Sequence, residues 1–262
     1  QIPGRGNSRN PYDAFSGALS VNFNSIAVKI AKNGRVTSAE PQTPLTPLAK
    51  KEALASRKRG KVRISLAKNR QKCLIYAGEL FKAIFIQEGL KVAGPVVVLD
   101  STQEPGKLFY RHRSSKDLTR VLAGMMRYSN NFTANQLFLT LGAELHGPPA
   151  NLAKSQRAVR AYLEGLGLKN VQAMEGSGLS RQNKITARQM LRILADFKPF
   201  RHLLPTKGRL AAKTGTLKGV RSLAGYIDPE KEHPAAFAII LNGKSAKPGR
   251  REIRVITKRG IS

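Results

Sequence analysis

Residues 210–242 read LAAKTGTLKGVRSLAGYIDPEKEHPAAFAIILN, and this stretch determines the fold predicted for the C-terminal part of the chain. It contains three apolar segments, at about 210–216, 220–227 and 235–242, which short polar turns separate. Short segments rich in branched and aromatic residues, bounded by turn residues, are typical of strands. The connections are too short for a crossover, so we expect three antiparallel neighbours in one sheet.

Helical patterns precede these strands. Apolar residues three and four positions apart predict an amphipathic helix capped by Ser115, at Leu118, Val121, Leu122, Met125 and Met126. Capping-box patterns predict two more helices, one starting at Thr133 and one at Thr186. Earlier in the chain we expect a helix from Tyr76 to about Gly89 and a strand over 92–99. The prediction is an α/β protein of the α+β kind, with an antiparallel sheet flanked by helices.

The first part of the chain, residues 12–72, is expected to be rich in strands and loops. Strands are predicted at 19–23 and 26–30, and Asn33-Gly34 predicts a hairpin because both residues tolerate positive φ. Basic residues gather between Lys50 and Arg63, which we interpret as a solvated loop. A patch for nucleic acid or an envelope polymer is the alternative. No aromatic residue is interleaved there, so base stacking is not supported.

The charge balance is the unusual feature of the composition. The 262 residues include 46 Lys and Arg against 16 Asp and Glu, which gives a net charge of +30. Such a field attracts nucleic acid, anionic envelope polymers and acidic peptides alike, so charge alone does not choose the partner. With 41% apolar residues the chain is expected to fold into a globular protein. No apolar run reaches the roughly 18 residues that a transmembrane segment needs.

Several classes of site are excluded or unsupported. Cys73 is the single cysteine, which excludes an internal disulfide and a thiolate metal cluster. The four histidines are far apart in the sequence, so no metal and no cofactor are expected. The chain starts with Gln1 and lacks the apolar stretch of a secretory signal, and we expect that an upstream part has been removed.

Two tripeptides carry the candidate chemistry. Ser129-Asn130-Asn131 falls in the break between two predicted helices, and Lys213-Thr214-Gly215 lies on the first strand of the C-terminal sheet. A cation beside a hydroxyl can bind a terminal carboxylate. Gly215 leaves room for a substrate backbone, and the N–H of Thr216 can point at a developing oxyanion. The alternative interpretation is structural: Ser129 and Asn131 as helix caps, and Lys213 as one more surface lysine.

These motifs and their flanks resemble a known family. Residues 120–242 are similar to the low-molecular-mass penicillin-binding proteins that act as D-alanyl-D-alanine carboxypeptidases and endopeptidases, in the branch with an inserted domain. The matching runs are Tyr128-Ser129-Asn130-Asn131, Glu175 to Arg181, Ala212 to Leu217, Gly219-Val220 and Leu223 to Tyr226. The resemblance of residues 19–24 to the end of the inserted domain is less specific. We therefore expect the tail of a β-rich inserted domain at 1–72 and the C-terminal part of the penicillin-binding core at 73–262.

The resemblance implies a serine β-lactamase-like fold and a role for each motif residue. Ser129 would relay a proton, Asn131 would bind the substrate amide, and Lys213 and Thr214 would hold the substrate carboxylate. Thr216 would donate one hydrogen bond to the oxyanion, and Gly215 would leave room for the substrate backbone. It also implies peptidoglycan peptides ending in D-Ala-D-Ala as substrates, β-lactam antibiotics as ligands, and a periplasmic or other extracytoplasmic location. Nucleic acid is not an expected partner.

The nucleophile motif of the family, Ser-x-x-Lys, has one literal match in the chain, at Ser65 to Lys68. Alternation of apolar and polar residues around it predicts a strand with Ser65 facing solvent, where two side chains three residues apart diverge. We therefore expect the chain by itself to be inactive. A non-catalytic peptidoglycan-binding protein is the alternative, and a basic nucleic-acid-binding protein is a weaker one. Ser177, between two glycines, is interpreted as a turn residue.

Overall fold

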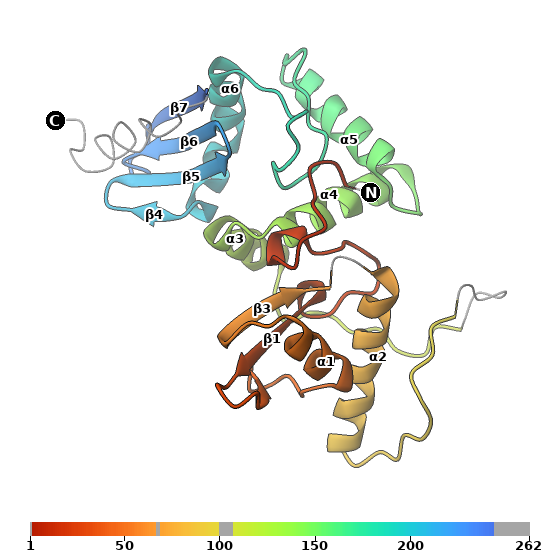
Figure 1. The fold of residues 1–262 in the computed structure, drawn as a ribbon. Coiled ribbons are helices and arrows are strands. Elements are labelled where there is room, and N and C mark those ends of the chain that lie inside the picture. The colour runs from red at the N-terminus through yellow and green to blue at the C-terminus, as the bar shows by residue number, and fades with distance from the viewer. Residues whose placement is uncertain (1, 67–68, 100–106, 244–262) are drawn as a thin grey trace. The chain divides into compact units, whose positions relative to one another are not determined.

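The chain forms two compact units in the computed structural model, which describes residues 2–66, 69–99 and 107–243 (Figure 1). One unit comprises residues 5–113, and the other comprises residues 114–262 together with residues 1–4. Each unit has a sheet and a hydrophobic core of its own.

The unit of residues 5–113 contains a three-stranded antiparallel sheet in the order β2-β1-β3. The strands are β1 (Ser25–Ile30), β2 (Val36–Ser38) and β3 (Gly60–Ser65). The predicted hairpin is confirmed, because β1 and β2 are joined by a turn in which Gly34 has a φ of +83°. In that turn the N–H of Arg35 donates to Asn33 Oδ1 over 3.1 Å.

Two helices cover this sheet and complete its core, α1 (Pro47–Ala55) and α2 (Arg70–Gln87). Their buried side chains pack against Ile26, Val28 and Ile64 of the strands. Cys73 of α2 is buried in the same core, and burial raises the pKa of its thiol to about 11. Because α2 belongs to this core, the compact unit extends past residue 72, where the sequence predicted a boundary, to Arg113.

Two local predictions for this unit are wrong, and a third is only partly correct. Residues 19–23 form no strand, because Asn22, Phe23 and Asn24 all have positive φ and make a single 3₁₀ turn. The buried Asn24 side chain stabilises this turn by donating to the carbonyl of Phe15 and to the hydroxyl of Ser20.

The other two concern residues 92–99 and the basic stretch. Residues 92–99 form no strand, and Val97 and Leu99 are exposed. The basic stretch is only partly a loop, because it includes most of α1 and the start of β3. Residues 56–59, which carry three of its cations, form the turn between these two elements.

The unit that holds residues 114–243 contains a four-stranded antiparallel sheet in the order β4-β5-β6-β7. The strands are β4 (Thr206–Lys207), β5 (Leu210–Leu217), β6 (Val220–Ile227) and β7 (Ala235–Asn242). The three long strands and their antiparallel order were predicted and are confirmed. The register pairs Lys213 with Ala224, and Gly215 with Ser222.

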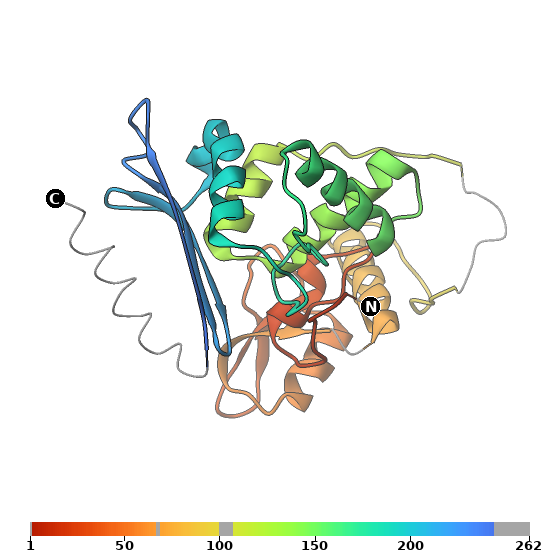
Figure 2. The same ribbon diagram turned by 90° about the horizontal axis from the view of Figure 1, so that it is seen from above.

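Four helices accompany this sheet: α3 (Leu118–Tyr128), α4 (Asn131–His146), α5 (Leu152–Gly165) and α6 (Ala187–Phe197). Figure 2 shows α6 lying along one face of the sheet. The hydroxyl of Tyr226 on β6 donates to the carbonyl of Leu194 on α6, and both residues belong to the core of this unit. The α4 and α5 helices pack on each other.

The predicted helices exist, but two of their starts differ. Asp117, not Ser115, caps α3, since its carboxylate accepts the N–H of Arg120 over 2.8 Å. The α4 helix begins at Asn131, before Thr133, because Asn130 supplies the cap. The predicted capping box of Thr186 is confirmed in α6. Among the described residues, no helix combines the length and the hydropathy that a membrane span requires.

Candidate active site

Ser129 lies at the junction between α3 and α4, where the chain changes direction in two residues. It is the C-cap of α3 and adopts a left-handed backbone conformation, with φ of +50° and ψ of +49°. Residues with a Cβ rarely adopt this conformation, which costs about 1–2 kcal/mol. Asn130 then caps α4 by accepting the N–H of Thr133 over 3.0 Å. The two caps leave the hydroxyl of Ser129 projecting from the turn.

Lys213 on β5 meets that hydroxyl. Its Nζ donates to Ser129 Oγ, and also to the carbonyl of Thr214 over 3.2 Å. The two residues are 84 positions apart in the sequence, so this contact depends on the fold of the whole unit. Partial burial lowers the pKa of Lys213 below its ordinary value, because desolvation disfavours the ammonium form. A lysine in this state binds an anion readily, since an anion restores the lost solvation.

The β5 strand has a free edge next to Lys213. Its neighbour β4 is only two residues long and pairs with Leu210 and Ala211 alone. Within the described part of the chain, residues 213–217 therefore have no strand partner on that side. An extended peptide can pair with such an edge through its main chain, with its end directed toward the lysine.

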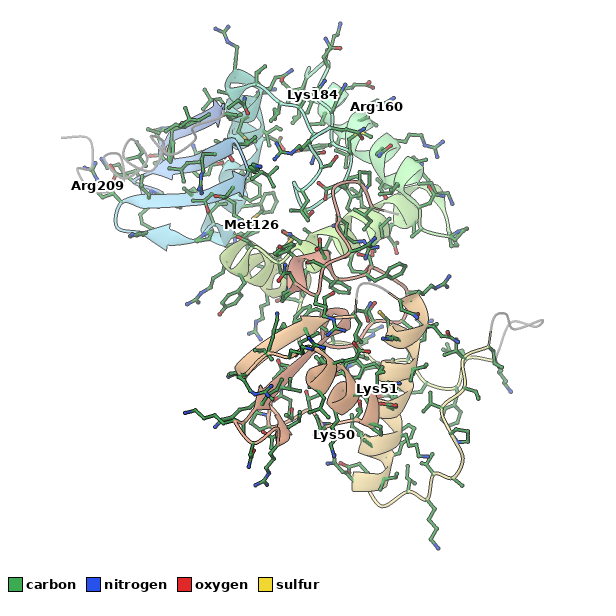
Figure 3. All side chains as sticks on the ribbon, in the orientation of Figure 1. Lys50, Lys51, Met126, Arg160, Lys184 and Arg209 are labelled. Atoms are coloured by element: carbon green, nitrogen blue, oxygen red, sulfur yellow. The ribbon has the colours of Figure 1, made fainter. Side chains whose placement is uncertain are left out.

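Two cavities share this lysine. One, of about 630 Å³, lies between β5–β7 and α6, with Ile193 and Phe197 on its apolar wall. The other, of about 240 Å³, adjoins Ser129. Thr214 and Met126 line both, and Figure 3 labels Met126 on α3 beside the sheet. No acidic residue is among the lining residues of either cavity in the described structure, which favours an anionic or neutral ligand.

A buried carboxylate organises the loop that forms one side of the larger cavity. Glu175 is only 5% exposed. Its Oε2 accepts the N–H and the hydroxyl of Ser177 over 2.7 and 2.5 Å. Its Oε1 accepts the N–H of Ser180 and the side-chain amide of Asn183 over 3.1 and 2.8 Å. Ser180 and Asn183 line the cavity, so this carboxylate fixes its wall.

Glu175 stands first in one of the matching runs, but the sequence patterns predicted no role for it. The available signal was an acid followed at two, five and eight positions by Ser177, Ser180 and Asn183. The turn role predicted for Ser177 is confirmed by its two hydrogen bonds to this carboxylate. A further hydrogen bond, from the N–H of Gly176 to Asn135 Oδ1 over 2.9 Å, joins the loop to α4.

The predicted site residues are placed as follows. Ser129 and Lys213 are in contact, and Thr214 and Gly215 line the larger cavity beside them. Asn131 is the first residue of α4, two positions after Ser129, and lines neither of the two cavities. Thr216 is exposed, and its hydroxyl accepts from Arg221 over 2.8 Å.

Ser65 is at the end of β3, where a strand was predicted. It is only 4% exposed, so the expectation that it faces solvent is wrong. Its N–H donates to the carbonyl of Arg9 over 2.9 Å, and residues 5–15 thereby cover the strand. Lys68, its partner in the literal motif, lies outside the described residues. In the described structure no three His, Cys, Asp or Glu side chains gather in a way that could hold a metal ion.

An antiparallel sheet with a helix on its face, and a lysine–serine pair at the sheet edge, is the arrangement of a penicillin-binding type of protein. Comparison of the sequence supports this class directly, since residues 53–203 and 197–259 match the D-Ala-D-Ala carboxypeptidase 3 (S13) family. The chain belongs to this family.

Two curated relatives give the same result. The chain is 31% identical over 196 residues to the D-alanyl-D-alanine carboxypeptidase DacB of Haemophilus influenzae. It is 30% identical over 203 residues to a D-alanyl-D-alanine carboxypeptidase of Actinomadura sp.. These matches cover 65% and 64% of this chain, but only 40% and 37% of the relatives. The chain thus spans about two fifths of the length of these relatives.

Solved structures confirm the predicted fold class. A crystal structure of penicillin binding protein 4 (dacB) from Haemophilus influenzae matches with a TM-score of 0.68 at 21% identity, over 94% of this chain and 67% of that one. The same protein in complex with a β-lactam matches with a TM-score of 0.65 at 22% identity, over 89% of this chain and 65% of that one.

Proposed function

We propose that this chain is the substrate-binding part of a serine-type D-alanyl-D-alanine carboxypeptidase or endopeptidase that acts on peptidoglycan outside the cytoplasm. The observation that supports it best is the contact between Lys213 and Ser129 at the free edge of β5. Family membership supports the substrate class, a peptide that ends in D-Ala-D-Ala. β-Lactams, which carry a carboxylate beside an acylating amide, would bind in the same place.

The family resemblance suggests a role for each motif residue. The Lys213 ammonium and the Thr214 hydroxyl would hold the terminal carboxylate of the peptide, whose backbone lies along β5 past Gly215. Asn131 would donate to the peptide amide, and the N–H of Thr216 would donate to the carbonyl oxygen as it gains charge.

The reaction would be acyl transfer to a serine. The oxygen of the nucleophilic serine, which is not Ser129, forms a bond to the carbonyl carbon of the penultimate D-Ala, and the peptide C–N bond breaks. Ser129, held by Lys213, would pass a proton to the leaving amine of the terminal D-Ala. Water then hydrolyses the ester and regenerates the serine.

We propose that this nucleophile lies outside the 262 residues. The literal match at Ser65 places the serine on a strand, buried at the end of β3. Losing the nucleophile of such a site costs on the order of 10⁶ in turnover. The chain by itself would therefore bind the peptide without cleaving it, which also makes non-catalytic peptidoglycan binding its expected property in isolation.

The binding role is tested by titrating the 262-residue chain with a short peptide that ends in D-Ala-D-Ala, followed by calorimetry or NMR. We expect Lys213→Ala to weaken binding by about tenfold or more, since a charged hydrogen bond contributes roughly 1.5–3 kcal/mol. The matched control is Lys218→Ala, which removes an exposed lysine from the adjacent turn. A peptide with a C-terminal amide should bind weakly to the unmodified chain. Equal effects of the two variants would contradict the proposed site.

The position of the nucleophile needs a separate measurement. A fluorescent penicillin should give no stable covalent label on the 262-residue chain, and mass spectrometry of digested protein would detect any acylated serine. Labelling of Ser65, or of any other residue in the chain, would overturn this part of the proposal while leaving the peptide-binding site intact.

A further inference from the structure

One end of the β2-β1-β3 sheet is densely basic. The register pairs Ile30 at the end of β1 with Gly60 at the start of β3, so the turn after β1 and the segment before β3 lie at the same end of the sheet. We call this surface the basic end and define it by Lys29, Lys32, Arg35, Lys58, Arg59 and Lys61. All six side chains are exposed.

Nothing acidic balances these charges locally. Residues 29–38 and 55–63 contain no Asp or Glu. Within the described residues, the ion pairs of this unit involve Arg9, Arg63 and Lys72, none of which belongs to the basic end. The carboxylates of these pairs come from Glu40 and Glu52. The basic end is therefore a concentrated positive surface and not half of an ion-pair network.

The strand register places two of these cations directly opposite each other. Lys29 on β1 is the direct partner of Lys61 on β3. Directly opposed residues on antiparallel strands have Cβ atoms about 4.5–5.5 Å apart, and like charges placed there repel. Ala27 and Arg63 are the next pair on the same outward face, and Arg63 does have its partner in Glu40. An external anion bound at this end of the sheet would neutralise the repulsion between Lys29 and Lys61.

We propose that the basic end binds a linear anionic polymer of the cell envelope, one that carries phosphates or carboxylates on a backbone without bases. Figure 3 shows nitrogen-tipped side chains projecting from this end of the sheet. Residues 29–38 and 55–63 contain no aromatic residue on which a base could stack, so recognition rests on charge spaced along the ligand. The choice of an envelope polymer rests on the proposed location outside the cytoplasm, but the inference goes beyond the peptidase role and uses no residue of the Lys213 site.

The test compares two variants of the 262-residue chain with equal net charge. The first replaces Lys29, Lys58, Arg59 and Lys61 by Gln. The control replaces four exposed cations outside the basic end, Lys50, Lys51, Lys169 and Arg188. The probes are long-chain inorganic polyphosphate, polygalacturonate and a single-stranded DNA of matched charge, and fluorescence anisotropy measures binding at several salt concentrations. Circular dichroism checks folding, and the smaller variant Lys58→Gln with Arg59→Gln serves if the fourfold variant unfolds.

We expect the first variant to bind a base-free polyanion about tenfold more weakly or worse, and to lower the slope of log affinity against log salt by about 2–3. The control should change both quantities much less. Tighter binding of polyphosphate than of polygalacturonate would identify phosphate as the recognised group. Tighter binding of polygalacturonate would identify carboxylate. Equal losses in the two variants would overturn the proposal, because they would reduce the effect to net charge. DNA binding tighter than both other probes would also overturn it, in favour of nucleic acid.

Discussion

At the scale of single residues, the candidate site depends on the partly desolvated side-chain amine of Lys213. Lys213 is held between the Ser129 hydroxyl and the Thr214 carbonyl, and neither group carries a charge. Neutral partners compensate an ammonium only in part, so its pKa falls. The same partial desolvation makes an incoming carboxylate a favourable partner. Sequence predicted the residue and its role, but the pKa direction required the burial that only the fold provides.

This lowered pKa predicts how peptide binding depends on pH. The carboxylate of a D-Ala-D-Ala peptide interacts with the protonated lysine, so affinity should be full below the lowered pKa and should fall as pH rises through it. The midpoint should therefore lie below the ordinary lysine value of 10.5. Calorimetric titrations between about pH 7 and 11 measure it. Lys213→Arg, which stays charged, should bind with little change over that range. A midpoint at or above the ordinary value in the unmodified chain would refute the argument.

The lowered pKa of Lys213 also determines how this residue makes the free energy of unfolding depend on pH. The unfolded chain binds the Lys213 proton more tightly than the folded chain does, because the folded-state pKa is the lower one. Below the lowered pKa the folded state therefore carries a desolvation penalty. That penalty is relieved as pH rises from the lowered pKa toward the unfolded value, so this residue contributes a rise in stability over that window.

Glu175 gives a second prediction at this scale. Both of its oxygens accept hydrogen bonds, Oε1 from Ser180 and Asn183 and Oε2 from Ser177. Glu175→Gln places an amide NH₂ against donors whichever way it turns, so we expect the free energy of unfolding to fall by about 1–3 kcal/mol. The control Glu164→Gln, at an exposed position on α5, should change it by less than about 0.5 kcal/mol. Urea denaturation measures both, and equal effects would remove the organising role of the buried carboxylate.

At the scale of elements, the predictions succeeded where the signal was local and periodic. The strands of residues 210–242 are apolar segments bounded by short turns, and α3, α4 and α6 have apolar residues at helical spacing, so each was predicted. Failures occurred where tertiary contacts decide. Residues 92–99 are apolar enough for a strand but pair with no other strand in the described structure. Residues 22–24 adopt positive φ because buried hydrogen bonds of Asn24 support the turn.

Some features of the candidate site could likewise be predicted from the sequence, and others could not. The motif residues could be identified from the sequence, and the helix break at Ser129 followed from the capping signals. The family resemblance implied that the helix break at Ser129 faces the strand of Lys213. The β4 strand, which leaves most of β5 with a free edge, is only two residues long and too short to show a pattern. The burial of Ser65 could not be identified, because it involves residues 5–15, far from β3 in the chain. Register and long-range packing carry that information, and neither has a local signature.

Substitutions at two helical glycines separate the effect of helix propensity from the effect of side-chain packing between helices. Gly124 in α3 has nothing within 4 Å of the position its Cβ would take. Gly142 in α4 would place a Cβ 2.5 Å from the backbone nitrogen of Ser155 on α5. Helix propensity alone favours Ala over Gly by about 1 kcal/mol at both positions. We expect Gly124→Ala to stabilise by about 0.5–1 kcal/mol, and Gly142→Ala to destabilise by about 1–3 kcal/mol because α4 and α5 must separate. Denaturant midpoints decide this, and two changes of the same sign would show that α4 and α5 are not closely packed.

At the scale of the whole molecule, the charge of +30 dominates. The chain has 16 Asp and Glu against 46 Lys and Arg, so most of its cations have no carboxylate to pair with. Most cations therefore contribute repulsion that compaction makes worse, since folding brings them closer together. Added salt should relieve this repulsion. The opposite effect, loss of attractive ion pairs on screening, is limited because exposed pairs contribute little.

The imbalance of charge predicts that added salt raises the melting temperature. Between about 10 and 150 mM sodium chloride the screening length falls from about 30 to about 8 Å. We expect the melting temperature to rise by about 2–4 °C, which corresponds to roughly 1 kcal/mol for a chain of this size. Differential scanning calorimetry measures the change. The variant with Gln at Lys29, Lys58, Arg59 and Lys61 should melt higher than the unmodified chain at low salt and gain less from added salt, because the opposed Lys29–Lys61 pair is gone. A melting temperature that falls with salt would mean that attractive ion pairs outweigh the repulsion, and the basic end would then need no external anion to be stable.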